Sequence, residues 1–539
     1  MTASNKVIYN TGILYLKMLL TAGISLYATR LLLEQLGVSD YGIYNLVSGV
    51  VAMLSFLNTA MTTSTQRYLS FSQGKGDPGM QRNIFSESLR LHFFVGIVIV
   101  VFLEIAGLFL FEGFLNIPEE RMFTAKVIYH FLSVSVFFTV LAVPYTAALT
   151  ARENMLWIAI VNTVETSLRL ISVLLLFVVT GNKLIYFGLY TALITVVSFI
   201  LYAVYCTKKY RECHFDYRSR EKDLLRELTS FAGWNVFGAL CGTARMQGLA
   251  VILNLFFGAA INAAYGVANQ LSLQLNFFSA TLLRTINPQI MKSEGANNHQ
   301  RMLRLSMIAG KFSFFLLAVL AIPCIFEMPR LLAFWLKEVP EYTAVFCSLI
   351  LVTILINQLT VGLQSSFQAI GQIKIYQLLV GVLLLLNLPI AYFLLKRGNP
   401  PYIVLISYLM IESSACVMRL FLAKRIAGLS IREYFEKVFF KEIIPVTVTI
   451  ATAYACTHLL EMPYRFLVTI PVSMLAFVVS VYFTGLCDDE KQLIHSFLRR
   501  SCRIFVIVNR TQQAPWFING KNERMKEMKE VKEMKVMEE

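Results

Sequence analysis

The segment LGVSDYGIYNLVSGVVAMLSFLNTAM, residues 36–61, shows how most of this chain is built. It is an apolar run long enough to cross a bilayer as a helix, since a crossing needs about 20 residues. Small and polar side chains recur along its second half and just beyond it at steps of three and four, which places them on one helical face. They are Ser48, Ala52, Ser55, Thr59, Thr62 and Gln66. We therefore predict a spanning helix with a polar face, suited to close helix packing or to the wall of a wet cavity.

The same pattern returns in the second half of the chain. YGIYN at 41–45 corresponds to YGVAN at 265–269, at the start of a second span with a polar face. Other segments pair in the same way, once a three-residue shift is allowed: SQGKGD with SEGANN (72–77 and 293–298) and two very short turns (152–154 and 371–373). A repeat of about 220 residues predicts two parallel bundles, an arrangement in which transporters rock one bundle against the other around a central site.

Composition places the chain in a membrane. Hydrophobic residues make up 57% of it and charged residues 15%, with a mean hydropathy of +0.62, whereas soluble proteins carry about 25% charged residues. We predict an all-α polytopic fold of about fourteen transmembrane helices, in which two helices follow the two six-helix bundles. The predicted parts are an N-terminal bundle (1–206), a basic cytoplasmic linker (207–228), a C-terminal bundle (229–423), a basic cytoplasmic loop (424–442), helices 13 and 14 (443–486) and a cytoplasmic amphipathic and charged tail (487–539).

The net charge of +15 is distributed in short connections between apolar spans. Connections predicted inside carry about 20 Lys or Arg, against about 7 in the outer ones, which is the bias that sets membrane orientation. We therefore expect both termini in the cytoplasm, and we expect no nucleic acid partner. The nine cysteines are scattered singly and no histidines cluster at ligand spacing, so neither a metal site nor a disulfide framework is predicted.

Three basic residues fall inside predicted spans, where a charge costs on the order of 2.5–3.5 kcal/mol. Lys17, Arg245 and Arg284 come from spans 1, 7 and 8, and Arg245 has no acid within seven positions along the chain. We predict that these cations line the substrate path, with snorkelling to the head groups as the alternative for each. The polar residues predicted to share their cavity are Thr21, Ser25, Asn45, Ser55, Thr59, Thr62, Gln66, Asn235, Asn269 and Gln274.

Two acids inside spans are candidate ion-coupling residues. Glu165 precedes Arg169 by four positions, a spacing at which the two side chains also neutralise each other on one helix. Glu412 lies near the middle of span 12 with Arg419 seven residues on. It is either a second structural pair or a protonatable coupling site, and the sequence leaves both interpretations open.

Several segments together resemble the polysaccharide flippases of the multidrug/oligosaccharidyl-lipid/polysaccharide exporter superfamily, particularly bacterial lipopolysaccharide (O-antigen) and capsule exporters. The resemblance covers most of residues 5–425. It is carried by LYLKMLLTAGISLYATRLLL (14–33), the segment quoted first (36–61), TQRYLSFSQGKGD (65–77), GWNVFGAL (233–240), QGLAVILNLFFG (247–258) and INPQIMKS (286–293). One departure is Lys17, where many relatives are expected to carry arginine, the better shape for phosphate.

The resemblance implies a multi-pass protein of the bacterial inner membrane that moves polyprenyl-pyrophosphate-linked oligosaccharide by alternating access. It implies no cofactor, with an ion gradient or the membrane potential as the driving force. The implied partners are the lipid-linked oligosaccharide, membrane lipids, and glycan polymerases or glycosyltransferases.

Two other functions fit the composition. A membrane enzyme of surface-glycan assembly would need catalytic residues gathered in a large outer loop, and the longest predicted outer connection, about residues 327–341, has no clustered acids or histidines. A cation-coupled multidrug exporter of the same fold would favour carboxylates in its cavity, whereas the candidate cavity here carries cations. We therefore expect a transporter rather than an enzyme. After Gly485, residues 490–508 read as a helix lying on the inner membrane surface.

Overall fold

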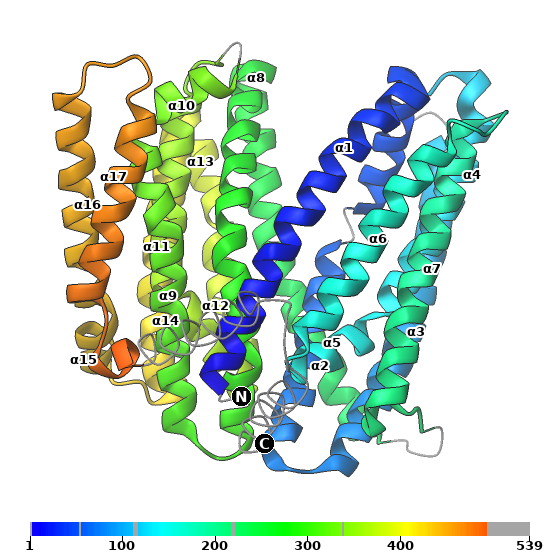
Figure 1. Ribbon diagram of the computed structural model, residues 1–539, viewed down its shortest axis with the longest axis horizontal. Helices are drawn as coiled ribbons and strands as arrows, with labels where there is room; N and C mark the ends of the chain where they lie inside the picture. The colour runs from blue at the N-terminus through cyan, green and yellow to red at the C-terminus, as the bar shows by residue number, and fades with distance from the viewer. Residues whose placement is uncertain (1–2, 53–54, 112–116, 217–220, 337–338, 493–539) are drawn as a thin grey trace, which may run out of the picture.

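The computed structural model describes residues 3–52, 55–111, 117–216, 221–336 and 339–492 (Figure 1). Nearly all of the predicted surface helix at 490–508, and the Lys/Glu/Met-rich end of the chain, lie outside these residues. The described residues form helices and no strands. The long helices are α1 (Ala3–Ala52), α2 (Ser55–Lys75), α3 (Pro78–Phe109), α4 (Glu119–Leu141), α5 (Val143–Ala151), α6 (Met155–Leu175), α7 (Lys183–Lys209), α8 (Lys222–Gly295), α9 (His299–Phe326), α10 (Met328–Trp335), α11 (Thr343–Ile370), α12 (Ile373–Leu385), α13 (Asn387–Lys396), α14 (Ile403–Ala427), α16 (Phe440–Leu459) and α17 (Phe466–Ser480).

Shorter elements complete the described chain. They are the helical turns η2 (Arg211–Cys213) and α15 (Ile431–Tyr434) and two π-helical segments, η3 (Phe435–Phe439) and η4 (Val481–Gly485), which adjoin the ends of α16 and α17.

Twelve segments of the described chain are long and apolar enough to cross a membrane. Two further passes are helical, at 38–75 apart from residues 53–54 and at 259–295, and these are the predicted spans 2 and 8. Neither is among the twelve apolar segments, because polar and hydroxyl-bearing residues are frequent along both of them. The all-α polytopic fold is thus confirmed, and about fourteen crossing helices are compatible with it.

The helices gather in two lobes (Figure 1). Helices α2 to α7 lie on one side, in the N-terminal lobe, and α8 to α17 lie on the other, in the C-terminal lobe. Helix α1 starts against α8 and crosses to the far end of the N-terminal lobe, packing on α6 along the way. It is joined to α8 by Tyr15, whose hydroxyl donates to the Phe278 carbonyl at 2.8 Å. Helix α1 therefore contacts both lobes.

Two glycines turn the chain between consecutive crossings at equivalent places in the two lobes. Gly37 has a φ of 72° and separates the first two passes, while Gly258 has a φ of 77° and separates the seventh and eighth. Both angles lie in the left-handed region that only glycine adopts without cost. The two positions have the spacing of the sequence repeat, so the repeat is also a repeat of backbone conformation.

Candidate functional site

The two lobes meet tightly at the end of the molecule where the chain begins, here called the closed side. The ends of α2 and α8 pack backbone to backbone through Gly74 and Gly295. A Cβ on Gly74 would lie 2.1 Å from the Lys292 carbonyl oxygen, and one on Gly295 would lie 2.1 Å from the Phe71 carbonyl oxygen. These glycines occupy equivalent positions in the repeated loops at 72–77 and 293–298. The lobes therefore touch through one pair of equivalent surfaces.

Two polar contacts join the lobes beside these glycines, and we call them the latches. In the first, Glu153 in the turn between α5 and α6 accepts a hydrogen bond from Gln289 at 2.8 Å and forms an ion pair with Lys292, both on α8. Only 1% of the Glu153 side chain is exposed. Its φ is 58°, a left-handed conformation that a non-glycine residue adopts at a cost of order 1–3 kcal/mol. Strain of this kind persists where surrounding contacts over-determine it.

In the first latch the N-terminal lobe supplies the acceptor, whereas in the second latch it supplies the donor. Arg67 of α2 reaches the C-terminal end of α11, where its Nε and Nη2 donate to the carbonyl oxygens of Gln368 and Ala369 at 3.0 and 3.1 Å. Gly371 ends that helix with a φ of 90°, and a Cβ there would lie 2.8 Å from Arg67 Nη2. A cation at the carbonyl end of a helix is favourable, because those carbonyls have no partners within the helix.

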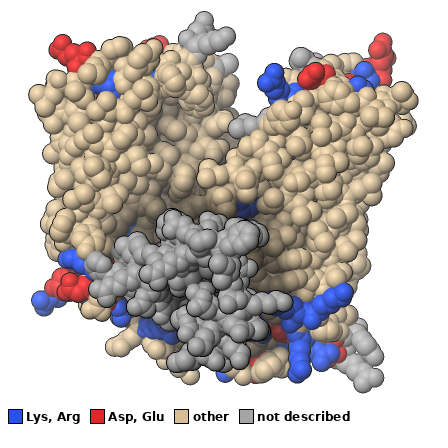
Figure 2. Space-filling view, in the orientation of Figure 1, with Lys and Arg blue, Asp and Glu red and all other residues tan. Residues whose placement is uncertain are grey.

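A hollow separates the lobes beyond the closed side (Figure 2). It opens at the opposite end of the molecule, the open side, and Figure 2 shows a basic group within it and further Lys and Arg along the closed side. The lobes are therefore in contact at one end of the molecule and apart at the other.

Lys17 of α1 and Arg284 of α8 lie near the place where these two helices pack against each other. Their charges are close enough to interact, although one residue belongs to α1 and the other to α8. The Arg284 side chain is solvent-accessible although protein atoms surround it. This combination is typical of a side chain that lines a cavity. Within the described residues, neither side chain makes a hydrogen bond or an ion pair. Two of the three predicted cations thus lie within electrostatic reach of each other, and neither side chain has a hydrogen-bond or ion-pair partner in the described chain.

The N-terminal lobe contributes a polar wall to this region. Glu165 and Arg169 of α6 form an ion pair at 2.9 Å, the structural pairing that the sequence allowed. Glu165 also lies close enough to Lys17 for their charges to interact. Tyr202 of α7 donates to Asn162 of α6 at 3.0 Å and is close enough to Glu165 and Arg284 for an electrostatic interaction. An anion entering between the lobes would meet two unpaired cations beside one carboxylate that is already paired.

Arg245 does not belong to this group. Arg245 has no acid nearby along its own helix, but its side chain is only 11% exposed and pairs with Glu412 of α14 at 3.0 Å, so the expectation of a free cation in the substrate path is wrong for this residue. Glu412 also pairs with Arg419 at 2.9 Å and accepts from Asn357 of α11 at 2.7 Å. Both carboxylate oxygens are therefore taken by donors within the C-terminal lobe. The pairing of Glu412 with Arg419 was one of the two interpretations left open, and the structure adds the second arginine.

The predicted polar cavity residues divide into three groups. Ser25, Asn45, Thr59 and Gln274 are exposed; Thr21, Thr62 and Asn269 are partly buried. Gln66 and Asn235 are buried, and Asn235 bonds to the carbonyl of Phe231 on its own helix. The side chain of Ser55 lies outside the described residues. The polar face of the second pass thus combines accessible positions with buried ones. Part of it fits the wall of a cavity, and part of it fits close helix packing.

Sequence reasoning missed the residues that make the latches. Arg67, Glu153 and Lys292 all sit in or next to the repeated segments, and that position was the signal by which they could have been found. They lie near the predicted ends of spans, where charged residues are common and therefore do not indicate a function. Across the described chain, no cluster of His, Cys, Asp or Glu has the geometry to hold a metal ion.

Comparison with known proteins identifies the family. The model of a family described as polysaccharide biosynthesis protein matches residues 4–294, more than half of the chain. This chain belongs to that family. A relative in Bacillus subtilis (strain 168), the uncharacterized membrane protein EpsK, is 21% identical over 271 residues. That match covers 50% of this chain and spans only about half of EpsK, 53% of its length.

Solved structures of MOP-superfamily transporters share the fold. An outward-facing multidrug resistance transporter of the MATE family has a TM-score of 0.68 at 14% identity, over 79% of this chain and 96% of that chain. A MOP-superfamily transporter from Pyrococcus furiosus, described as having a binding pocket of reverse polarity, has a TM-score of 0.66 at 15% identity, over 79% and 98%. The chain thus combines membership of a polysaccharide biosynthesis family with the fold of MOP-superfamily transporter structures, as the sequence predicted.

Proposed function

We propose that this transporter flips a polyprenyl-pyrophosphate-linked oligosaccharide from the cytoplasmic to the outer leaflet of the bacterial inner membrane by alternating access. The observation that carries the proposal is a pair of neighbouring cations, Lys17 and Arg284, whose side chains have no partner in the described chain, in a molecule whose lobes touch at one end only. The family, whose description is polysaccharide biosynthesis, supplies the class of cargo.

The chemistry of the cargo explains why cations are needed. A glycan cannot enter hydrocarbon, since each unpaired hydroxyl costs on the order of 2–7 kcal/mol to bury, and a pyrophosphate linker adds negative charge. Lys17 and Arg284 offer hydrogen-bond donors and positive charge to that linker, while the lipid tail stays in the bilayer. Each contact should contribute about 1–3 kcal/mol, as charge-assisted hydrogen bonds do.

The distribution of Lys and Arg supports an orientation with the closed side in the cytoplasm. The basic connections at 207–228 and 424–442 both join helices at that side, and positive residues favour the cytoplasmic face. In this orientation the hollow opens outward, as in the outward-facing MATE structure that shares the fold. An ion gradient or the membrane potential would then drive the return of the transporter to the inward-open state. Glycan polymerases or glycosyltransferases would act before or after the translocation of the lipid-linked oligosaccharide.

Multidrug export is the second candidate, because the similar structures include a multidrug resistance transporter. A site for organic cations would need a free carboxylate between the lobes. Glu165 is paired with Arg169, and Glu412 is enclosed by arginines of its own lobe. The charges therefore favour an anionic cargo.

The test removes both free cations at once. The double variant Lys17→Ala with Arg284→Ala should lower export of surface glycan at least tenfold, because 1.4 kcal/mol already corresponds to tenfold. Lipid-linked units should accumulate in the cytoplasmic leaflet while the amount of transporter in the membrane stays normal.

The matched control removes two surface cations from the closed side, Arg304→Ala with Arg432→Ala, and should leave export unchanged. Export at the wild-type rate in the Lys17 and Arg284 double variant would refute an anion site between the lobes. A drop in resistance to cationic drugs, with normal glycan export, would favour the multidrug function instead.

A further inference from the structure

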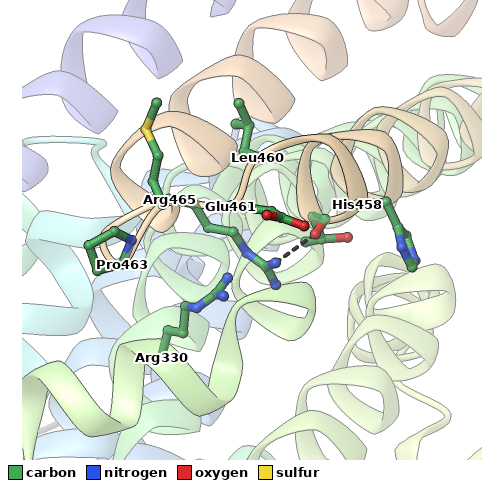
Figure 3. A pocket seen from close by; sticks show the side chains of 8 residues that line it. Arg330, His458, Leu460, Glu461, Pro463 and Arg465 are labelled. Carbon is green, nitrogen blue, oxygen red and sulfur yellow. Dashed lines mark hydrogen bonds between the residues drawn. The ribbon is translucent and has the colours of Figure 1, made fainter.

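A second polar pocket lies on the flank of the C-terminal lobe, at its open side and separate from the hollow. It has a volume of about 430 Å³ and is formed by α10, the end of α16 and the turn that leads into α17 (Figure 3). Four of its side chains can carry charge: Arg330, His458, Glu461 and Arg465. Nothing in the proposed transport cycle uses these residues.

The two arginines are held in place from below by a buried acid. Glu327 has a fully buried side chain and accepts from Arg465 Nε at 2.8 Å, while Arg330 Nη1 lies at 3.5 Å. Arg465 also donates to the carbonyl of Thr457 at 2.6 Å, the bond drawn in Figure 3. A guanidinium has five N–H donors, so each arginine keeps donors for a ligand. Their positions are fixed before any ligand arrives.

The charges of the pocket are arranged in a way that describes a ligand. Arg330 and Arg465 share the single buried carboxylate of Glu327, and a second carboxylate, that of Glu461, stands in the pocket lining. Glu461 also lines the pocket and makes no ion pair within the described residues. Figure 3 places its side chain close to that of Arg465, on the side away from Arg330. A molecule with an anionic group and a nearby ammonium group could bind the arginines with the first and Glu461 with the second.

Apolar side chains line the pocket and flank its lining residues in the chain. Met462 lines it and is exposed, and Leu459 and Tyr464, each next to lining residues in sequence, are exposed as well. Aromatic and apolar side chains around a polar site are typical of the level where lipid head groups meet water. The ligand is therefore expected to be part of the bilayer rather than a free solute.

We propose that this pocket binds the head group of a zwitterionic phospholipid with a primary amine, of the phosphoethanolamine type. The phosphate lies against Arg330 and Arg465, and the ammonium donates to Glu461. A phosphocholine head group has the same charges but no N–H donors, so it cannot make the second contact. A phosphoglycerol head group lacks the cation. The pocket thus selects among lipids by one hydrogen-bonded ion pair.

Thermal unfolding of the purified full-length protein in detergent, titrated with lipids that share the same acyl chains, tests this site. The phosphoethanolamine lipid should stabilise with an apparent dissociation constant about tenfold below that of the phosphocholine and phosphoglycerol lipids, because one charge-assisted contact is lost with either. Glycerophosphoethanolamine, the soluble head group, should cause no shift at the same concentration. Equal midpoints for the three lipids, or an equal shift with the soluble compound, would overturn the proposal.

Two variants test the contacts to the ammonium and to the phosphate separately. Glu461→Gln should abolish the preference for phosphoethanolamine over phosphocholine, and Arg330→Gln should weaken all three lipids alike. The control Arg432→Gln changes an exposed arginine at the closed side and should behave as wild type. If Glu461→Gln retained the lipid preference, the Glu461 carboxylate would not be the group that binds the ammonium.

Discussion

The latch at Glu153 gives the sharpest test of the alternating-access mechanism. Glu153→Gln keeps the size of the side chain and its ability to hydrogen-bond Gln289, and it removes only the charge that Lys292 faces. The carboxylate is buried when the lobes touch and would reach water when they part. The substitution should therefore destabilise the sealed state selectively.

The magnitude follows from the contacts. A hydrogen bond to a charged group contributes about 1.5–3 kcal/mol, and Glu153 makes two direct ones, of which the bond to Gln289 weakens and the pair with Lys292 is lost. Lys6, at 3.9 Å and partly exposed, adds little because water screens it. A net loss of about 2–4 kcal/mol shifts the equilibrium between sealed and parted lobes by about 30- to 900-fold.

Distances between spin labels at positions 75 and 296, at the closed ends of α2 and α8, measure this equilibrium in a cysteine-free background. The population with long distances should rise in Glu153→Gln. Glu212→Gln is the matched control, because it removes a buried acid that pairs with Arg152 inside the N-terminal lobe at 2.6 Å. An unchanged distance distribution in Glu153→Gln, or an equal change in the control, would refute the latch.

Substitutions at three positions have further expected outcomes. Lys17→Arg should sustain glycan export, since it keeps the charge and adds donors, whereas Lys17→Ala should slow it; equal export by both would exclude a role for the charge. Glu412→Gln should lower the unfolding free energy by about 3–5 kcal/mol, because Arg245 and Arg419 would be left buried without their anion; an unchanged melting temperature would contradict this. Glu442→Gln should have the opposite sign or no effect in the same melting experiment, because neither carboxylate oxygen of this buried residue has a partner within the described residues.

The sequence alone determined the class of fold and its internal symmetry. Apolar runs of bilayer length dictate spanning helices, because backbone groups in hydrocarbon must bond within their own segment. The repeat then indicated two equivalent lobes, and the structure shows equivalent glycine turns at 37 and 258. The polar faces of spans 2 and 8 also followed directly from helical periodicity.

Tertiary structure decided which charges are free. Arg245 seemed unpaired because only its own helix could be inspected, and its partner Glu412 is 167 residues away. Lys17 and Arg284 are further apart still in sequence, yet their charges are close enough to interact. Helical periodicity fixes the face on which a residue lies but not the neighbour that this face meets. The rotation and contact of packed helices set that neighbour, so ion pairs, latches and the open cations emerge only when the lobes are assembled.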